Sequence, residues 1–155
     1  AALCQFTQMA PPILYYGTEV GVTQERDVLQ GDFAILEEAR QPMRWDTDQD
    51  RTLLAFYRRL IHFRRAHPAS YQGTRIPLCA DSVGLLAYAR QHASETVITS
   101  LNNSDEAQTL TLSLAPLVAP PTHFTDLDGA PHAAPTATLR LTLPARSGTV
   151  LVGLV

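Results

Sequence analysis

The hydrophobic pattern of the first seventy residues predicts two helices with a strand and a long polar stretch between them. Five apolar residues share one helical stripe that stops at Pro11-Pro12: Ala2, Leu3, Phe6, Met9 and Ala10. Ile13 to Tyr16 then form a continuous apolar run, which is typical of a strand covered on both faces. Residues 18–50 carry many charges and few periodic apolar positions, so we expect a long loop there, and such loops are usually functional or disordered.

The clearest predicted element is a helix that begins near the N-cap candidates Thr47 and Asp48 and ends before Pro68. Its apolar stripe consists of Leu53, Leu54, Tyr57, Leu60, Ile61 and Phe63. Arginines lie beside or opposite this stripe. They could form a surface for an anionic partner, but a solvated helix face is the simpler interpretation because aromatic residues do not alternate with them and the chain as a whole is acidic.

The second half of the chain has the pattern of an antiparallel β-sandwich. Seven short segments rich in β-branched or alternating residues are separated by turn signals; they are residues 74–80, 83–90, 96–103, 108–114, 122–129, 137–143 and 148–155. In residues 108–114 and 137–143 leucines alternate with polar residues, which predicts one buried and one solvated face. The Ala- and Pro-rich residues 129–137 are predicted to be a surface loop.

Composition narrows the classes of function. The chain has 155 residues, 45% hydrophobic and 17% charged, with a net charge of −3, which fits a globular protein and gives no reason to expect nucleic acid or a membrane as partner. No run of about 18 apolar residues indicates a membrane span. Cys4 and Cys79 suggest neither a disulfide framework nor a zinc site, and the histidine spacing indicates no metal. We therefore predict no cofactor.

The first residue is Ala, without an initiator Met, and the opening stripe looks like the last turns of a helix already under way. These two observations suggest that the chain is a C-terminal piece of a longer protein.

Four motifs carry a family resemblance. They are "PPILYYGTEVG" at residues 11–21, "ARQPMRWD" at 39–46, "LLAFYRRLIHFRRAHPAS" at 53–70 and "LPARSGTVLVG" at 143–153. Together, and in this order, they resemble the closing part of alpha-amylase family enzymes, the glycoside hydrolases of family 13. The resemblance implies that residues 1–69 are the end of a (β/α)8 barrel, with its eighth strand and helix, and that residues 70–155 are the C-terminal β-sandwich domain. The expected fold is mainly β.

The same resemblance supplies candidate site residues. Ile13 to Tyr16 would be the eighth barrel strand, and the following loop would leave the face that carries the active site in such barrels. Tyr16 would pack at the barrel rim, and Glu19 would border the sugar-binding cleft. Both are candidates for substrate contact.

Arg40 is the leading candidate for a sugar contact. The matching arginine of many family members binds sugar hydroxyls, and a guanidinium can donate to two oxygens while a carboxylate holds it in place. The usual acid four residues upstream is Leu36 here, so Glu37 and Glu38 are the candidate partners. A structural salt bridge of Arg40 is the alternative. Trp45 could stack on a sugar, although packing under the loop is the preferred interpretation.

No catalytic residue is carried over. The family's nucleophile and acid/base lie on the fourth and fifth strands, and no histidine precedes His62 to supply the motif of the seventh. The parent enzyme is expected to cleave or transfer α-glucosidic bonds of an α-glucan or maltooligosaccharide, while the 155-residue chain itself has no turnover. Its expected partners are the rest of the barrel and a second copy through Ile13 to Tyr16. Two alternatives remain open: a non-catalytic carbohydrate-binding module and a docking domain.

Overall fold

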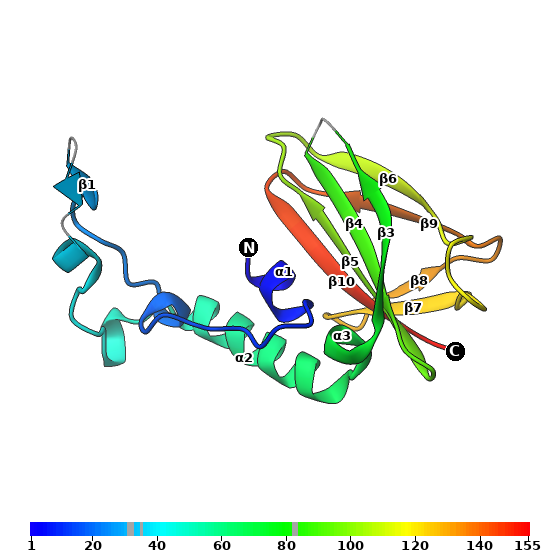
Figure 1. The fold of residues 1–155 in the computed structure, drawn as a ribbon, viewed down its shortest axis with the longest axis horizontal. Coiled ribbons are helices and arrows are strands. Elements are labelled where there is room, and N and C mark those ends of the chain that lie inside the picture. The colour runs from blue at the N-terminus through cyan, green and yellow to red at the C-terminus, as the bar shows by residue number, and fades with distance from the viewer. Residues whose placement is uncertain (31–32, 35, 82–83) are drawn as a thin grey trace. The chain divides into compact units, whose positions relative to one another are not determined.

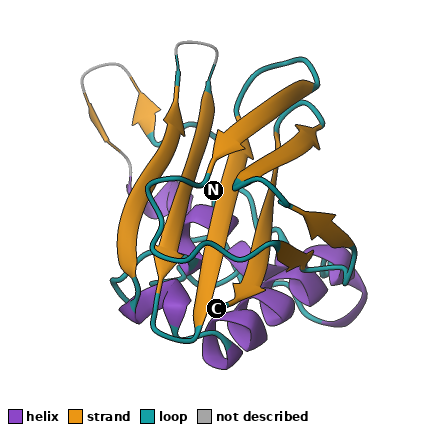
Figure 2. Ribbon diagram, turned by 90° about the vertical axis from the view of Figure 1, so that its right-hand side faces the viewer, coloured by secondary structure: helices purple, strands orange, loops and turns teal. Residues whose placement is uncertain are grey.

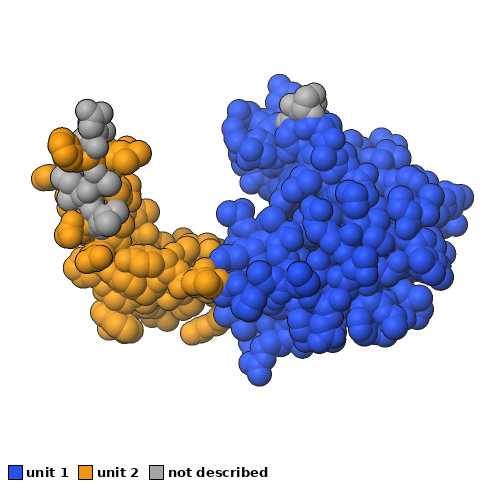
Figure 3. Space-filling view, in the orientation of Figure 1, with its two compact units in different colours: residues 1–12, 60–155 blue, residues 13–59 orange. Residues whose placement is uncertain are grey.

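The computed structural model describes residues 1–30, 33–34, 36–81 and 84–155. It divides into unit 1, residues 1–12 and 60–155, and unit 2, residues 13–59, shown in blue and orange in Figure 3. The helices of unit 1 are α1 (Ala2–Phe6), the C-terminal part of α2 (Arg51–Ala66) and α3 (Ala69–Gln72). Its strands are β3 (Thr74–Ala80), β4 (Leu85–Gln91), β5 (Glu95–Asn102), β6 (Gln108–Ser113), β7 (His123–Asp126), β8 (Pro131–Ala133), β9 (Thr138–Leu143) and β10 (Ser147–Leu154).

Unit 1 is an antiparallel β-sandwich (Figures 1 and 2). Six strands form one sheet in the order β3-β4-β5-β10-β7-β8, and β6 pairs with β9 to form the second layer. In β6, Leu110 and Leu112 are buried, while Thr109 and Thr111 face solvent, as the alternation predicted. The sandwich is therefore confirmed, and the seven predicted segments each contain a strand; Val83, in the second of them, lies outside the described residues.

The large sheet has a core on each face. Between the two layers, Phe124 of β7 and Leu151 of β10 pack with the inward leucines of β6 and β9. On the opposite face, Val97 and Val150 pack with Phe63 of α2 and Ala69 of α3. The large sheet is thus covered on both sides, by the two-stranded β6–β9 sheet on one and by helices on the other.

The helix α1 ends earlier than predicted, at Phe6 rather than at the prolines. The physical reason lies in Arg64 of α2, whose guanidinium donates to the carbonyls of Phe6 and Gln8 at 2.8 and 2.6 Å, and to those of Met9 and Ala10 at 3.2 Å. Because one side chain satisfies these four carbonyl groups, residues 7–10 need no helical hydrogen bonds. Met9, predicted on the apolar stripe, is 72% exposed.

The helix α2 confirms the strongest sequence prediction, but its N-cap differs. The helix begins at Arg51, and Oδ1 of Asp50 accepts a hydrogen bond from the backbone N–H of Leu53 at 2.9 Å. Asp50 is therefore the N-cap, and Asp48 belongs to a preceding 3-10 turn, η3 (Asp46–Asp48), together with Thr47. A carboxylate three residues before the capped N–H satisfies the cap geometry that Thr47 and Asp48 are too distant to reach.

Apart from the start of α2, the elements in the described part of unit 2 are short. They are η1 (Thr18–Val20), β1 (Leu29–Gln30), β2 (Phe33–Ala34), η2 (Leu36–Ala39) and η3. The predicted strand Ile13 to Tyr16 is not a strand in the structure, and Ile13 is 85% exposed. A β-strand requires backbone pairing with a neighbouring strand, and the described strands pair with one another instead.

The predicted surface loop at residues 129–137 contains the short edge strand β8, which pairs with β7. Asp126 organises this hairpin: Oδ1 accepts hydrogen bonds from the backbone N–H groups of Asp128 and Ala130, both at 2.9 Å, and Oδ2 lies 3.0 Å from Nε2 of His132. Pro131 stands at the first position of β8, where a missing N–H is tolerated on an edge.

The Asp126 carboxylate predicts a pH-dependent stability. Its hydrogen bond with His132, and then its backbone hydrogen bonds, outweigh partial desolvation and hold the pKa of Asp126 below its usual value. A depressed folded-state pKa stabilises the protein above the unfolded pKa of about 3.9, and this contribution is lost as the pH falls through the folded value. Urea unfolding of the wild type and Asp126→Asn at a series of pH values is expected to show a difference that shrinks as the pH falls below about 4.

The matched control for this measurement is Asp48→Asn, since Asp48 is an exposed acid outside the hairpin. The difference in free energy of unfolding between Asp48→Asn and the wild type should not shrink in the same way as the pH falls. If the free energy of unfolding of Asp126→Asn differed from that of the wild type by the same amount at neutral and acidic pH, the negative charge of Asp126 would not be what stabilises the hairpin.

No helix of the described residues is long and apolar enough to cross a membrane.

Candidate functional site

The candidate site residues all lie in unit 2, and a sharp turn follows the first of them. Gly17 has a φ of +85°, and a Cβ at this position would lie 2.7 Å from Cγ2 of Val22. Its carbonyl accepts hydrogen bonds from the N–H groups of Val20 and Val22 at 3.1 and 2.9 Å. Only glycine fits this positive φ without a clash, so the turn after the two tyrosines is built into the sequence.

Tyr16 is tied to the segment that contains Arg40. Its hydroxyl donates to the carbonyl of Gln41 at 3.0 Å, and its ring packs on Tyr15 with centroids 4.7 Å apart. Gln41 in turn donates through Nε2 to the carbonyl of Glu38 at 3.1 Å. We call residues 36–41 the Arg40 loop. One hydrogen bond thus connects a residue just before the glycine turn with a loop more than twenty residues later, and a second hydrogen bond lies within that loop.

The Arg40 loop is a 3-10 turn, η2, that closes with a hydrogen bond from the N–H of Arg40 to the carbonyl of Glu37 at 2.9 Å. Arg40 and Glu37 are exposed, and Glu38 is half-buried. Among the described residues, Arg40 has no ion pair at 4.0 Å or less. The loop therefore holds its backbone in place while the side chain of Arg40 is exposed.

The charge of Arg40 also acts on Tyr16. Desolvation, followed by the hydrogen bond and charge interaction with Tyr15, raises the pKa of the Tyr16 phenol, and the positive charge of Arg40 works in the opposite direction.

Glu19 stands apart from Tyr16 and the Arg40 loop. It lies in η1 and is half-buried, and its Oε2 atom is buried without a hydrogen-bond partner in the described part of the chain. No hydrogen bond or ion pair between the described residues joins Glu19 to the Arg40 loop. The structure thus brings together Tyr16, Glu37, Glu38 and Arg40, and it leaves Glu19 as a separate candidate.

Trp45 does not have the packing role preferred from the sequence, because its side chain is 68% exposed. Other large apolar side chains of unit 2 are also exposed: Ile13, Tyr15, Leu29 and Phe33. The indole of Trp45, four residues after the Arg40 loop, is open to solvent and available to stack on a ring.

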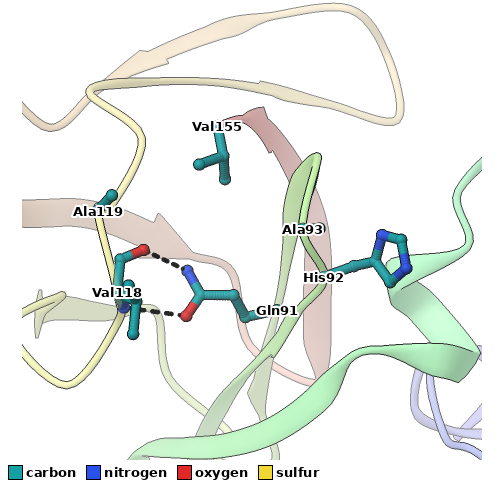
Figure 4. Close-up of a pocket in the computed structure, with 6 residues that line it drawn as sticks. All are labelled: Gln91, His92, Ala93, Val118, Ala119 and Val155. Atoms are coloured by element: carbon teal, nitrogen blue, oxygen red, sulfur yellow. Dashed lines mark hydrogen bonds between the residues drawn. The ribbon is translucent and has the colours of Figure 1, made fainter.

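Unit 1 offers a shallow pocket of about 240 Å³ between the end of β4, the segment around Val118 and Val155 (Figure 4). Gln91 donates through Nε2 to the carbonyl of Val118 at 2.8 Å and accepts from its N–H at 2.9 Å, so both ends of the amide are occupied. The other residues that line this pocket are His92, Ala93 and Ala119. None is a Trp, Tyr or Phe, so the pocket has no stacking platform for a sugar.

A second pocket, of about 270 Å³, lies over β7 and β10 and is lined by Thr122, His123, Thr125, Val152 and Leu154. It also has no aromatic ring other than an imidazole. Across the described residues, no cluster of three or more His, Cys, Asp or Glu side chains could hold a metal ion.

The geometry defines a β-sandwich with an attached helix and an exposed, tyrosine-anchored arginine loop. No protein-family model matches the chain. The chain is 37% identical over 114 residues to "Alpha-amylase 2" of Dictyoglomus thermophilum, a match that covers 73% of this chain and 20% of the relative. A solved cyclomaltodextrinase superposes with a TM-score of 0.79 at 32% identity over 97% of this chain and 24% of that one. AmyP in complex with maltose gives a TM-score of 0.79 at 22% identity, covering 97% and 33%.

The homologues of this chain are enzymes of the alpha-amylase family, glycoside hydrolase family 13, among them cyclomaltodextrinases and a neopullulanase. The resemblance drawn from the four sequence motifs is therefore confirmed. The chain spans about a fifth of the length of the curated relatives that it matches. The two compact units do not coincide with residues 1–69 and 70–155, and that domain assignment stays a prediction.

Two residues that matter in the structure were missed from the sequence. Gln41 connects Tyr16 to Glu38, and nothing in its sequence position predicts this bridging role. Arg90 is 4% exposed on β4, and here a signal exists: it shares a strand face with Tyr88, two residues before it, where an apolar residue is expected.

Proposed function

We propose that this chain is the closing part of an α-glucan-active enzyme, comprising the end of its catalytic barrel and the β-sandwich that follows. In that role it supports the barrel and borders the sugar cleft, and it has no turnover by itself. The observation that supports the proposal most directly is the hydrogen bond from the Tyr16 hydroxyl to the backbone carbonyl of Gln41, which holds the Arg40 loop while Arg40 itself is exposed.

The proposed ligand is an α-glucan or maltooligosaccharide bound through the whole enzyme. Arg40 would donate hydrogen bonds to sugar hydroxyls, and Glu37 or Glu38 would orient it once a substrate is present. Tyr16 would position the loop. Glu19, whose buried Oε2 atom has no hydrogen-bond partner among the described residues, would line the cleft or support it. Among the structural neighbours, AmyP was solved with maltose.

The exposed apolar side chains of unit 2 support the second part of the proposal, contact with the rest of a barrel. Ile13 is 85% and Phe33 78% exposed, which is costly for a surface that meets only water. We propose that the remaining barrel covers them. Without it, a second copy of the chain could bind at the same surface.

A docking domain without sugar contact is the second candidate function, and the same exposed residues favour it. A carbohydrate-binding module is less well supported, because the two pockets described above have no Trp, Tyr or Phe ring among their lining residues.

The proposal is tested by incubating the purified 155-residue chain with maltoheptaose, measuring reducing ends for hydrolysis and heat for binding. We expect no hydrolysis, because the nucleophile and acid/base of the family mechanism are not among the motifs present. Hydrolysis by this chain would contradict the proposal. Saturable binding without hydrolysis would favour a binding module, and concentration-dependent self-association without binding would favour docking.

A further inference from the structure

Arg90 is a buried cation with one unpartnered edge. The residue is 4% exposed, and its Nε and Nη2 atoms are buried without a hydrogen-bond partner among the described residues. These two atoms lie on the same side of the planar guanidinium group. Their N–H bonds are parallel, and this is the edge that binds both oxygens of a carboxylate at once.

Two neighbours of Arg90 add positive charge around it. Arg75 is its direct cross-strand partner in the β3–β4 ladder and stands over the ring of Tyr88, with Cζ 4.6 Å from the centroid. Burial lowers the pKa of Arg90, the Tyr88 phenol works in the opposite direction, and the charges of Arg64 and Arg75 lower the pKa further. Like charges directly opposite each other in a ladder are destabilising.

No carboxylate of the described residues forms an ion pair with any of these three arginines. The nearby strand β5 carries a buried acid, Glu95, but its oxygens are occupied: Oε1 accepts from the N–H of Ala69 at 2.9 Å, and Oε2 lies 2.8 Å from Nδ1 of His67. Arg64 is itself held by four backbone carbonyls. Arg90 is left as a desolvated charge, and such charges are retained in proteins when an opposite charge pairs with them.

We propose that the Nε–Nη2 edge of Arg90 is a binding site for one carboxylate group, on the helix-covered face of the sandwich. The group binds side-on through two parallel N–H donors, and Arg75, an exposed residue of the edge strand β3, moves aside from the ring of Tyr88 to admit it. The positive charge of Arg75 then adds to the attraction between Arg90 and the bound carboxylate. The carboxylate comes either from a small organic acid or from an Asp or Glu side chain of another polypeptide segment.

The test is a titration of the ¹⁵N-arginine-labelled chain with sodium acetate at pH 7, with sodium chloride holding the ionic strength constant. The Nε–H resonance of Arg90 is expected to move downfield saturably, while that of the exposed Arg140 on β9 stays in place. In parallel, 200 mM acetate is expected to raise the Tm of the wild type by about 2–5 °C, because a ligand that binds only the folded state stabilises it.

Arg90→Met removes both donors and is expected to abolish the acetate-dependent rise in Tm, while Arg140→Met keeps it. Arg90→Lys keeps the charge without the two-donor edge and should lose most of the response. An Arg90 resonance that does not move with acetate would overturn the proposal, and so would an Arg90→Met chain with the full response. The resonance is measured on the wild type, so this outcome does not depend on how a variant folds.

A second comparison separates the two sources of the carboxylate. Acetate binding to the 155-residue chain that disappears in a longer polypeptide containing it would assign the site to an Asp or Glu of that polypeptide. Binding that persists in the longer polypeptide would assign it to a small organic acid. Both results support a carboxylate site.

Discussion

Replacing Arg40 by methionine is expected to lower kcat/KM for maltooligosaccharides by about 10- to 150-fold in the enzyme that contains this chain. A hydrogen bond to a charged group contributes about 1.5–3 kcal/mol, and each 1.36 kcal/mol corresponds to about a factor of ten in rate. Methionine keeps an unbranched stem close in length to the aliphatic part of arginine and removes the donors. Because Arg40 is exposed and its side chain has no ion pair among the described residues, the loop itself should persist.

The measurement is steady-state kinetics with maltoheptaose, with circular dichroism to show that the fold is retained. Arg44→Met is the matched control, since Arg44 is also exposed and lies four residues further along the same segment. It should change kcat/KM little. Equal values for Arg40→Met and the wild type would contradict the proposed sugar contact, and a matching loss of stability would favour the structural role of Arg40.

The largest expected effect on stability comes from Phe124→Ala. Phe124 is 1% exposed in the core between the two layers of the sandwich, and one atom of its ring, Cε1, lies only 2.8 Å from where a Cβ on Gly153 of β10 would stand. A truncation at such a site leaves a cavity that the surrounding strands cannot fill, and it is expected to lower the free energy of unfolding by about 3–5 kcal/mol.

Urea unfolding followed by far-ultraviolet circular dichroism measures this difference. Val118→Ala is the control, because Val118 is 79% exposed and its truncation should change the free energy of unfolding by less than about 0.5 kcal/mol. A loss below about 1 kcal/mol for Phe124→Ala would mean that the layers do not pack as described.

The parts of the fold that follow from local pattern could be predicted from the sequence. Alternating leucines in β6 and β9 specify one buried face, and a wide apolar stripe specifies α2, because these periods report directly on which side meets the core. Long-range contacts were not predictable in this way. The early end of α1 is accompanied by hydrogen bonds from Arg64, which is more than fifty residues away. The contact of Asp126 with His132 in the β7–β8 hairpin spans only six residues, but no alternating pattern marks it.

The apolar run Ile13 to Tyr16 shows a second limit. Its composition favours a strand, but a strand also needs a pairing partner, and composition does not reveal whether one is present. The candidate site, too, was only partly predictable from the sequence. Arg40, Glu37, Glu38 and Tyr16 were selected by family resemblance, whereas the hydrogen bond from Tyr16 to the backbone carbonyl of Gln41 is visible only once the chain folds.

The central claim, that this chain works as part of a larger α-glucan-active enzyme, is tested most directly by the intact mass of the natively produced polypeptide that contains "YYGTEVG". The account predicts a mass far above 17.0 kDa, with roughly 250 or more further residues, as a complete barrel requires. A native polypeptide of 17.0 kDa would contradict it.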